Sequence, residues 1–397
     1  MAGSMNVFGT ICTRACSGRG PAAGWEGRGR RPRVEKIFIL LALLLMINGW
    51  KAEACTSVII SGIVRSDGRP VMLKHRDTRE LDNRLEWFHG EHFNFVALVN
   101  SNWESSPVAV NASNEAWSGM NSAGFCIMNT ATYDLKDDDV PDSMMDREGE
   151  VMFRCLGICR TVSDFENFLD TLARPMGVEA NFGVIDASGG AAYYEVNNHS
   201  WVKFDVNSLE EGYMVVTNFT RTGRKADRRG EDRFRKASEI MEKIGPDASC
   251  SRILNSISRS GKPIVRKITS SSILFQGVRK GEDPFKAVMW TILGSPCCAP
   301  YIPVMVFDSD HIPWFLKGEE KSGKALFCDM ALQIKTREGL EGDVPSCNKV
   351  ENMVDRKFGS IYRRLDNGRL SHREFTKRYD MLADTIYIKY SARFLNK

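Results

Sequence analysis

The stretch "CTSVIISGIVRSDGRPVMLKHRDT", residues 55–78, decides the fold that this chain can adopt. Its first part, "CTSVIISGIV" (55–64), is rich in β-branched side chains and predicts a strand. The turn signal "SDGRP" reverses the chain, and "VMLKH" (71–75) predicts the returning strand. The stretch therefore predicts a β-hairpin that begins at Cys55, and it raises the question of what that cysteine does.

An apolar run, "IFILLALLLMI" at 37–47, precedes the hairpin. It is too short to span a bilayer as a helix, which needs about 20 residues. Arginines and Lys36 stand before the run, and Ala52 and Ala54 occupy the −3 and −1 positions of a cut before Cys55. We interpret 37–54 as the hydrophobic core and cleavage region of a signal peptide. Residues 1–36 are then a dispensable basic leader, or one that results from a start site assigned too early.

This leader predicts an exported protein, periplasmic or secreted, with no stable membrane span after the signal is removed. It also carries the chain's positive charge. Residues 1–54 hold eight Lys or Arg and three acidic residues, a net charge of +5, whereas the whole chain has +4. The part from Cys55 onward is therefore at −1, which argues against a nucleic-acid-binding protein.

The cysteines do not predict a metal site. Two of the 11 lie in the leader, which leaves nine, and an odd number in an exported protein indicates at least one free thiol. Cys155 and Cys159 lie in a helical pattern, and Cys297 and Cys298 are adjacent with no paired histidine nearby. Zinc needs about four nitrogen or sulfur ligands, so we expect neither a metal nor another cofactor.

Strand patterns continue along the chain, with helical patterns gathered between them rather than in strict alternation. Further strands are expected at 93–101, 124–131, 181–187, 191–196, 213–219, 271–278, 286–293 and 302–308, and helices at 149–160, 162–174 and 230–244. This order indicates an α+β layered fold. Two long amphipathic helices after about residue 345 predict a C-terminal helical extension, packed on the core or on a partner subunit, which leaves a homo-oligomer open.

A cut of the chain directly before Cys55 best explains how this sequence could catalyse a reaction. The sequence lacks a G-x-S-x-G elbow, a Walker A loop and an H-E-x-x-H motif, and we take His89 and His92 as loop or surface residues. After the cut, Cys55 carries both a thiol and a free α-amine. The amine has a pKa of about 8, close to about 8.5 for the thiol, so it can take the thiol proton.

Five motifs in chain order carry a family resemblance: the hairpin itself, "GMNSAGFCIMNTATY", "NFGVIDASGGAAYYEV", "VVTNFTRTG" and "GEDRFRKA". Over about residues 55–310 the chain resembles the N-terminal-nucleophile (Ntn) amide hydrolases. The branch is that of choloylglycine hydrolases, penicillin V acylases and the acyl-coenzyme A:6-aminopenicillanic acid acyltransferase family. The resemblance implies a four-layer αββα sandwich of two antiparallel sheets over 55–340, followed by the helical extension at 345–397.

The same resemblance implies roles for single residues. Cys55 would be the nucleophile with its own amine as base, and Asp77 would orient the α-ammonium. Asn129 and Asn218 match the two asparagines at the oxyanion hole, and Arg233 matches the arginine that completes the site. The plainer alternatives are a surface aspartate next to a turn for Asp77 and a strand-end asparagine that caps a turn for either amide.

Lys74 departs from the bile-salt branch, which has an arginine three residues before the aspartate. Lysine keeps the charge but loses the planar guanidinium fork. The neighbouring Arg76 could compensate, so we count both as candidate substrate-binding residues; a polar strand end is the plainer alternative for "LKHRD".

The leading hypothesis is a hydrolase that cleaves a linear, non-peptide amide C–N bond of a small-molecule N-acyl substrate through an acyl-thioester on Cys55. An acyltransferase would use the same acyl-enzyme with an amine or thiol as acceptor. A third alternative is a lipid-anchored, non-catalytic binding module attached through Cys55. The match to a lipobox is poor, because Ala52 stands where leucine is usual.

Overall fold

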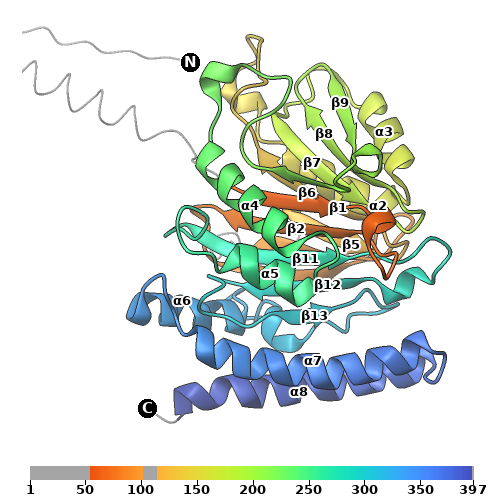
Figure 1. The fold of residues 1–397 in the computed structure, drawn as a ribbon, viewed down its shortest axis with the longest axis vertical. Coiled ribbons are helices and arrows are strands. Elements are labelled where there is room, and N and C mark those ends of the chain that lie inside the picture. The colour runs from red at the N-terminus through yellow and green to blue at the C-terminus, as the bar shows by residue number, and fades with distance from the viewer. Residues whose placement is uncertain (1–53, 102–113, 396–397) are drawn as a thin grey trace, which may run out of the picture. The chain divides into compact units, whose positions relative to one another are not determined.

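The computed structural model describes residues 54–101 and 114–395, all within one compact unit, Lys51–Lys397. The predicted leader (1–36) and the signal region up to residue 53 lie outside the described residues. Two antiparallel sheets form the centre of the described part (Figure 1). They stack face to face, and each is covered by helices on its outer face.

Sheet A contains, in order across the sheet, β10 (Tyr213–Val216), β1 (Thr56–Ile60), β2 (Val71–Asp77), β11 (Thr269–Gln276), β12 (Val288–Leu293) and β13 (Ile302–Val304). The predicted hairpin is its centre: β1 and β2 pair with Thr56 opposite His75 and Ile60 opposite Val71. The first strand ends at Ile60 rather than at residue 64. Ser61 ends it, because its hydroxyl accepts a hydrogen bond from Ile63 N (3.1 Å) and begins a 3₁₀ turn at Gly62–Val64.

Sheet B contains, in order, β3 (Asn83–Phe88), β4 (Phe95–Asn100), β5 (Ser118–Asn121), β6 (Cys126–Ala131), β7 (Ala180–Ile185), β8 (Ala191–Val196) and β9 (Trp201–Asp205). It approaches sheet A closely at Gly183, where an added Cβ would lie 2.4 Å from Met128 Cε and 3.1 Å from Ile59 Cδ1. A glycine is therefore needed there for the two sheets to pack.

The helices are α2 (Glu148–Ile158), α3 (Val162–Thr171), α4 (Glu231–Ile244), α5 (Cys250–Ser258), α6 (Leu326–Glu338), α7 (Val344–Asp366) and α8 (His372–Leu395). The helices α4 and α5 cover the outer face of sheet A, and α2 packs on β4, β5 and β6 of sheet B. Phe165 of α3 stacks edge-on against Phe182 and Tyr194 of the same sheet. The α+β fold with αββα layers is thus confirmed (Figure 1).

The last three helices pack on the β12–β13 side of sheet A (Figure 1). Two buried tyrosines of α8 fix them: Tyr379 Oη donates to the Pro303 carbonyl (2.9 Å) and Tyr390 Oη to the Cys298 carbonyl (2.7 Å). Of the two packing partners expected for the extension, the structure therefore shows the core of the same chain. A homo-oligomer stays a prediction.

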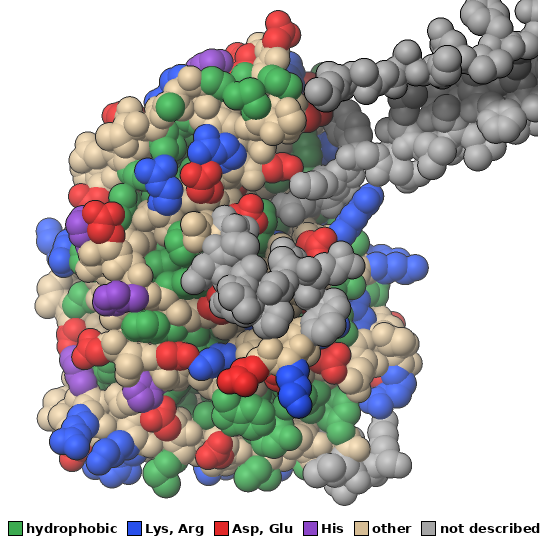
Figure 2. Space-filling model, turned by 180° about the vertical axis from the view of Figure 1, so that it is seen from behind, with side chains coloured by type: hydrophobic (Ala, Val, Ile, Leu, Met, Phe, Trp, Pro, Cys, Tyr) green, Lys and Arg blue, Asp and Glu red, His purple; other side chains and the backbone are tan. Residues whose placement is uncertain are grey.

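Sequence patterns missed β3, β5 and β9 as well as α5 and α6. The strand β5 has only four residues, and β9 is an edge strand with no fully buried residue, so neither gives a strong alternating pattern. The described residues contain no helix long and apolar enough to cross a membrane. Figure 2 shows acidic and basic side chains interspersed on the face turned away from the view in Figure 1, as is typical of a solvated surface.

One buried ion pair joins the two-sheet core to the C-terminal helices. Arg259, just after α5, contacts Glu351 of α7 with an Nη2–Oε1 distance of 2.6 Å, and their side chains are only 7% and 3% exposed. Glu351 Oε1 also accepts from Tyr301 N (3.0 Å), and Arg259 Nε donates to the Pro296 carbonyl (2.8 Å). Both charges are therefore held by several hydrogen bonds.

We expect Glu351→Ala to lower the free energy of unfolding by about 3–5 kcal/mol, because it leaves a guanidinium buried without its carboxylate. Urea unfolding followed by circular dichroism measures the change, with the exposed Glu239→Ala of α4 as the control. A loss in Glu351→Ala as small as that in the control would contradict the assignment of this pair as a structural link.

Candidate active site

Cys55 lies directly before β1 and is 3% exposed. The β1–β2 ladder continues past it, because Ala54 N donates to the Asp77 carbonyl (3.0 Å). The backbone of Cys55 is held on both sides: its N–H donates to Asn218 Oδ1 (2.9 Å), and its carbonyl accepts from Arg233 Nη1. The structure therefore brings Cys55, Asn218 and Arg233 together, as the family resemblance implied.

Asn218 follows β10, the strand that pairs with the other edge of β1. Its Oδ1 also accepts from Arg233 Nη2 (2.6 Å), and its Nδ2 donates to the Ala131 carbonyl (2.7 Å). In this orientation the amide oxygen, not the amide nitrogen, faces Cys55. Because Nδ2 carries two protons, the bond to Ala131 leaves the amide one further N–H.

Arg233 lies in the first turn of α4 and is 4% exposed. The helix begins after Gly230, which has a φ of 81° and at which an added Cβ would lie 2.2 Å from Arg233 Nη2. This glycine therefore allows the guanidinium to reach Cys55 and Asn218. Burial lowers the pKa of Arg233, against the attraction of Asp77 and of Cys55.

Asp77, the last residue of β2, is buried, so the alternative of a surface aspartate is wrong. Its Oδ1 accepts from Thr269 Oγ1 (2.6 Å), and Oδ2 lies 3.6 Å from Arg266 Nη1. Oδ2 has no hydrogen-bond donor among the residues that the structure describes. Burial raises the pKa of Asp77 to about 6, although the Thr269 bond and the charges of Arg233 and Arg266 lower it.

His75 lies on the same face of β2 as Asp77 and was not expected near the site. Its Nδ1 is 2.8 Å from Ser272 Oγ, and its Nε2 is 3.5 Å from Asp77 Oδ1. Burial and the nearby Arg233 lower its pKa to about 3, so the imidazole is neutral at ordinary pH. Thr269 and Arg266 meet Asp77 only because β11 pairs with β2, and no local sequence signal predicts that pairing.

A hydrogen bond from Lys74 fixes the side chain of Asn129. Lys74 Nζ donates to Asn129 Oδ1 (2.7 Å) and to the Trp117 carbonyl (2.5 Å). The ammonium group therefore bridges from sheet A to sheet B. These contacts fix Asn129 in β6 without a turn, so the turn-capping alternative is wrong, and its predicted oxyanion role stays a prediction.

Arg76 also points from β2 toward sheet B. Its Nη1 donates to Asn83 Oδ1 (2.5 Å) and to Asn100 Oδ1 (3.0 Å), and its guanidinium lies 4.9 Å from the ring centroid of Trp117. The side chain is 2% exposed. These contacts favour a structural role between the sheets over the substrate-binding role predicted for Arg76.

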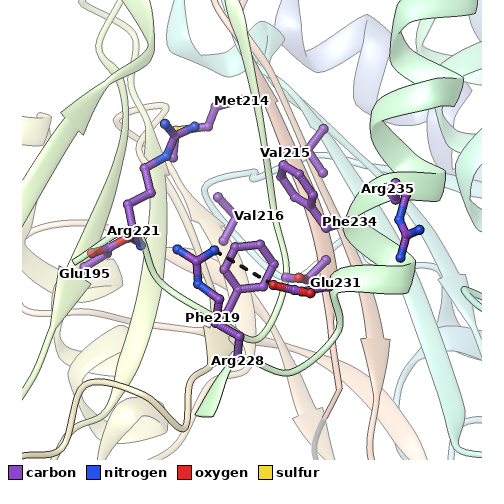
Figure 3. Close-up of a pocket in the computed structure, with 11 residues that line it drawn as sticks. Glu195, Met214, Val215, Val216, Phe219, Arg221, Arg228, Glu231, Phe234 and Arg235 are labelled. Atoms are coloured by element: carbon purple, nitrogen blue, oxygen red, sulfur yellow. Dashed lines mark hydrogen bonds and ion pairs between the residues drawn. The ribbon is translucent and has the colours of Figure 1, made fainter. Parts of the chain in front are cut away.

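A cavity of about 630 Å³ opens beside the candidate nucleophile. Ala54, Asn218 and Arg233 form its inner wall. A second cavity of about 460 Å³ lies around β10 and the start of α4, with an apolar wall that includes Met214, Val216 and Phe219 (Figure 3). Thr217 and Phe219 line this second cavity, whereas Asn218 lines the first, so the two cavities share one short segment of chain.

Neither metal nor disulfide chemistry is evident in the described ranges. They contain no group of three or more His, Cys, Asp or Glu side chains placed to hold a metal ion. None of the nine cysteines in 54–101 and 114–395 forms a disulfide.

Comparison with solved structures finds, among others, three proteins of similar arrangement at low identity. The Caenorhabditis elegans N-acylethanolamine-hydrolyzing acid amidase ortholog is 14% identical, with a TM-score of 0.42, over 55% of this chain and 92% of that chain. Penicillin V acylase from Agrobacterium tumefaciens is 14% identical (TM-score 0.42; 64% and 87%). A C2A mutant of conjugated bile acid hydrolase from Clostridium perfringens is 10% identical (TM-score 0.41; 64% and 93%).

A scan against protein-family models finds no match, and a search of curated proteins finds no significant similarity. With TM-scores below 0.5, the three structural likenesses do not define a function.

The raised pKa of Asp77 predicts a specific pH dependence of stability. The folded protein holds the Asp77 proton up to about pH 6, whereas the unfolded chain releases it near 3.8, so ionisation costs stability as pH rises through this window. We expect Asp77→Asn to remove a fall of about 2 kcal/mol in unfolding free energy between pH 4 and pH 7.

The measurement is urea unfolding of both proteins at the two pH values, on full-length chain in which intact mass shows Ala54 still joined to Cys55. If the variant loses as much stability as the parent between pH 4 and pH 7, Asp77 is not the titrating group.

Proposed function

We propose that this chain is an exported cysteine hydrolase that cleaves a linear amide C–N bond of an N-acyl compound through an acyl-thioester on Cys55. The observation that carries the proposal is the pair of hydrogen bonds to the backbone of Cys55. This buried cysteine precedes a central strand, and Asn218 and Arg233 bind its N–H and its carbonyl. Both bonds come from side chains rather than from a sheet ladder, so they gather polar groups around the residue that carries the thiol.

The proposed reaction begins once the bond between Ala54 and Cys55 is cut. In the structure, the Cys55 peptide N–H stands where the α-amine would then be. The amine takes the thiol proton, and the thiolate sulfur attacks the substrate carbonyl carbon, which places negative charge on the carbonyl oxygen. N–H donors at that oxygen, among them the second N–H of Asn218, would stabilise it by a few kcal/mol.

Collapse of this intermediate breaks the C–N bond, and the leaving nitrogen takes the proton from the α-ammonium. Water then attacks the thioester, with the amine again as general base, and releases the acid and the Cys55 thiol. An amine acceptor in place of water would give the acyltransferase reaction. A product assay with and without added amine distinguishes the two outcomes.

Two further features support the proposal. Asp77 lies one rung from Cys55 on the β1–β2 ladder, and its Oδ2 has no hydrogen-bond donor among the described residues, so an ammonium created by the cut would have a buried carboxylate beside it. The burial of Cys55 disfavours the lipid-anchored alternative, because a diacylglyceryl group on its sulfur would have to be accommodated inside the protein.

We expect Cys55→Ala to lose amide hydrolysis by at least about 10³-fold, because no other group at the site can form the acyl-thioester. Turnover is measured on a panel of penicillin V, bile-acid conjugates, N-acyl-homoserine lactones and N-acyl amino acids. Circular dichroism and the unfolding midpoint check that the variant is folded. Retained turnover by the folded variant would refute the nucleophile assignment.

One extra residue before Cys55 is expected to be nearly as damaging, since it converts the basic amine into a neutral amide. The test compares protein that begins at Cys55 with protein that begins Met-Cys55, both verified by mass spectrometry. Circular dichroism and the unfolding midpoint provide the control that both proteins are folded. A fully active Met-Cys55 protein would exclude the α-amine as the base.

A further inference from the structure

Positive charge is concentrated in the last two helices of the chain. The net charge of −1 from Cys55 onward is divided unevenly: residues 344–397 hold twelve Lys or Arg and six acidic residues, a net charge of +6. Residues 55–343 therefore have a net charge of −7. We refer to α7, α8 and the turn between them as the α7–α8 pair. This pair is basic, whereas the core on which it packs is acidic.

The carboxylates of the α7–α8 pair are almost all bound to the core. Five of the six contact core residues: Glu351, Asp355, Asp366, Asp380 and Asp384. For example, Asp366 Oδ1 lies 3.0 Å from Lys286 Nζ, and Asp355 Oδ2 accepts from Tyr301 Oη (2.9 Å). The sixth, Glu374, accepts from Ser371 N (2.9 Å) at the start of α8. The negative charge of the pair is therefore used in packing and in a helix cap.

The basic side chains have the opposite arrangement. Ten with described side chains lie in this pair, and all ten are exposed: Lys349, Arg356, Lys357, Arg363, Arg364, Arg369, Arg373, Lys377, Arg378 and Lys389. None of the ten forms an ion pair with a residue in 54–101 or 114–395. The two signs of charge are thus separated, with carboxylates toward the core and cations toward solvent. Within the described ranges, no carboxylate lies within 4 Å of these cations to neutralise them.

A groove of about 560 Å³ lies between the two helices on this outer side. Met353 and Leu382 are buried and give it an apolar floor. Three exposed cations line it as well: Arg356, Lys357 and Arg378. Its lining includes no acidic residue among those that the structure describes. An apolar floor with cations at its edges suits a partner that is both apolar and anionic.

Large apolar side chains also project from α8. Met381, which lines the groove, is 72% exposed, and Ile388 is 67% exposed. The two are seven residues apart, which places them on one face of the helix about 10 Å apart along its axis. Trp314, also exposed, packs against α8 with its ring centroid 4.6 Å from that of Tyr387. The described part exposes six large apolar side chains, and half of them are therefore on α8 or against it.

We propose that the outer side of the α7–α8 pair, which forms the lower edge of the molecule in Figure 1, binds the surface of a membrane that contains anionic lipids. The cations contact lipid phosphates, and Met381 and Ile388 enter the boundary between headgroups and acyl chains. A nucleic acid also presents phosphates, but it would leave these two side chains in water. The exposed apolar groups therefore favour a lipid surface. This surface takes no part in the reaction proposed for Cys55, so the two proposals stand or fall separately.

The test measures co-sedimentation with lipid vesicles. It uses protein that begins at Cys55, which keeps every described helix and strand, because the apolar run at 37–47 would bind lipid by itself. We expect at least about tenfold stronger partitioning to phosphatidylcholine vesicles with about 30% phosphatidylglycerol than to phosphatidylcholine alone. Most of this difference should be lost in about 0.5 M NaCl, which screens exposed charges. Equal partitioning to the two kinds of vesicle, or none to either, would overturn the inference.

A charge variant tests whether the groove is the site of contact. Arg356→Gln/Lys357→Gln/Arg378→Gln should weaken partitioning to the anionic vesicles by at least about tenfold. The matched control, Lys225→Gln/Lys236→Gln/Lys243→Gln, makes the same change in net charge in α4 and just before it. If the control loses as much binding as the groove variant, or if the groove variant loses none, the α7–α8 pair is not the docking surface.

A second variant distinguishes a lipid surface from a general polyanion. Met381→Ser/Ile388→Ser leaves every charge in place and should weaken partitioning to the anionic vesicles by at least about threefold. Because both side chains are exposed, the unfolding midpoint should stay unchanged. A serine variant that binds the vesicles as tightly as the unmodified protein would contradict the lipid assignment. So would binding of short duplex DNA as tight as that of the vesicles, since the surface would then recognise phosphates alone.

Discussion

The side-chain oxygen of Asn218 is the contact on which the rest of the site depends. It accepts hydrogen bonds from the Cys55 nitrogen and from the guanidinium of Arg233 at once. These three residues come from the start of β1, the end of β10 and the first turn of α4, so one amide joins two strands and a helix. The same amide donates from its nitrogen to Ala131 at the end of β6 in the other sheet. Any displacement of the two sheets would therefore move the groups around the thiol.

The strand β2 explains how such a polar site is kept inside a sandwich. It is buried along its whole length, yet "VMLKHRD" carries three side chains that are ordinarily charged. Burying charges is costly unless each is paired. Alternation along the strand sends Lys74 and Arg76 toward amide and carbonyl oxygens of sheet B, and Asp77 toward Thr269 and Arg266 on the helical side. The strand thus anchors both of its neighbouring layers, which ties the position of Asp77 to the packing of the sandwich.

Local sequence patterns were sufficient for the hairpin, for most strand positions and for the two long C-terminal helices, because each has a strong hydrophobic period. They failed where a single side chain or a distant partner decides the structure. Ser61 ends β1 early through one capping bond, which no periodicity records. The motif match placed Asn218 and Arg233 beside Cys55 correctly, but it could not show that Asn129 is fixed by Lys74 across the two sheets. That contact depends on how the sheets stack, and stacking is a property of the whole core.

The electrostatics of the site differ before and after the proposed cut. With Ala54 in place, the Cys55 nitrogen is a neutral peptide group, and the buried Asp77 carboxyl has a pKa of about 6 despite two nearby arginines. The cut would replace that neutral group by an amine that can carry a positive charge near the Asp77 carboxyl. A nearby opposite charge favours the ionised form of a carboxyl group. An ionised Asp77 in turn favours the ammonium. Removal of the leader would therefore do more than expose a nucleophile: it would supply a charge that lowers the cost of a buried, ionised Asp77 at neutral pH.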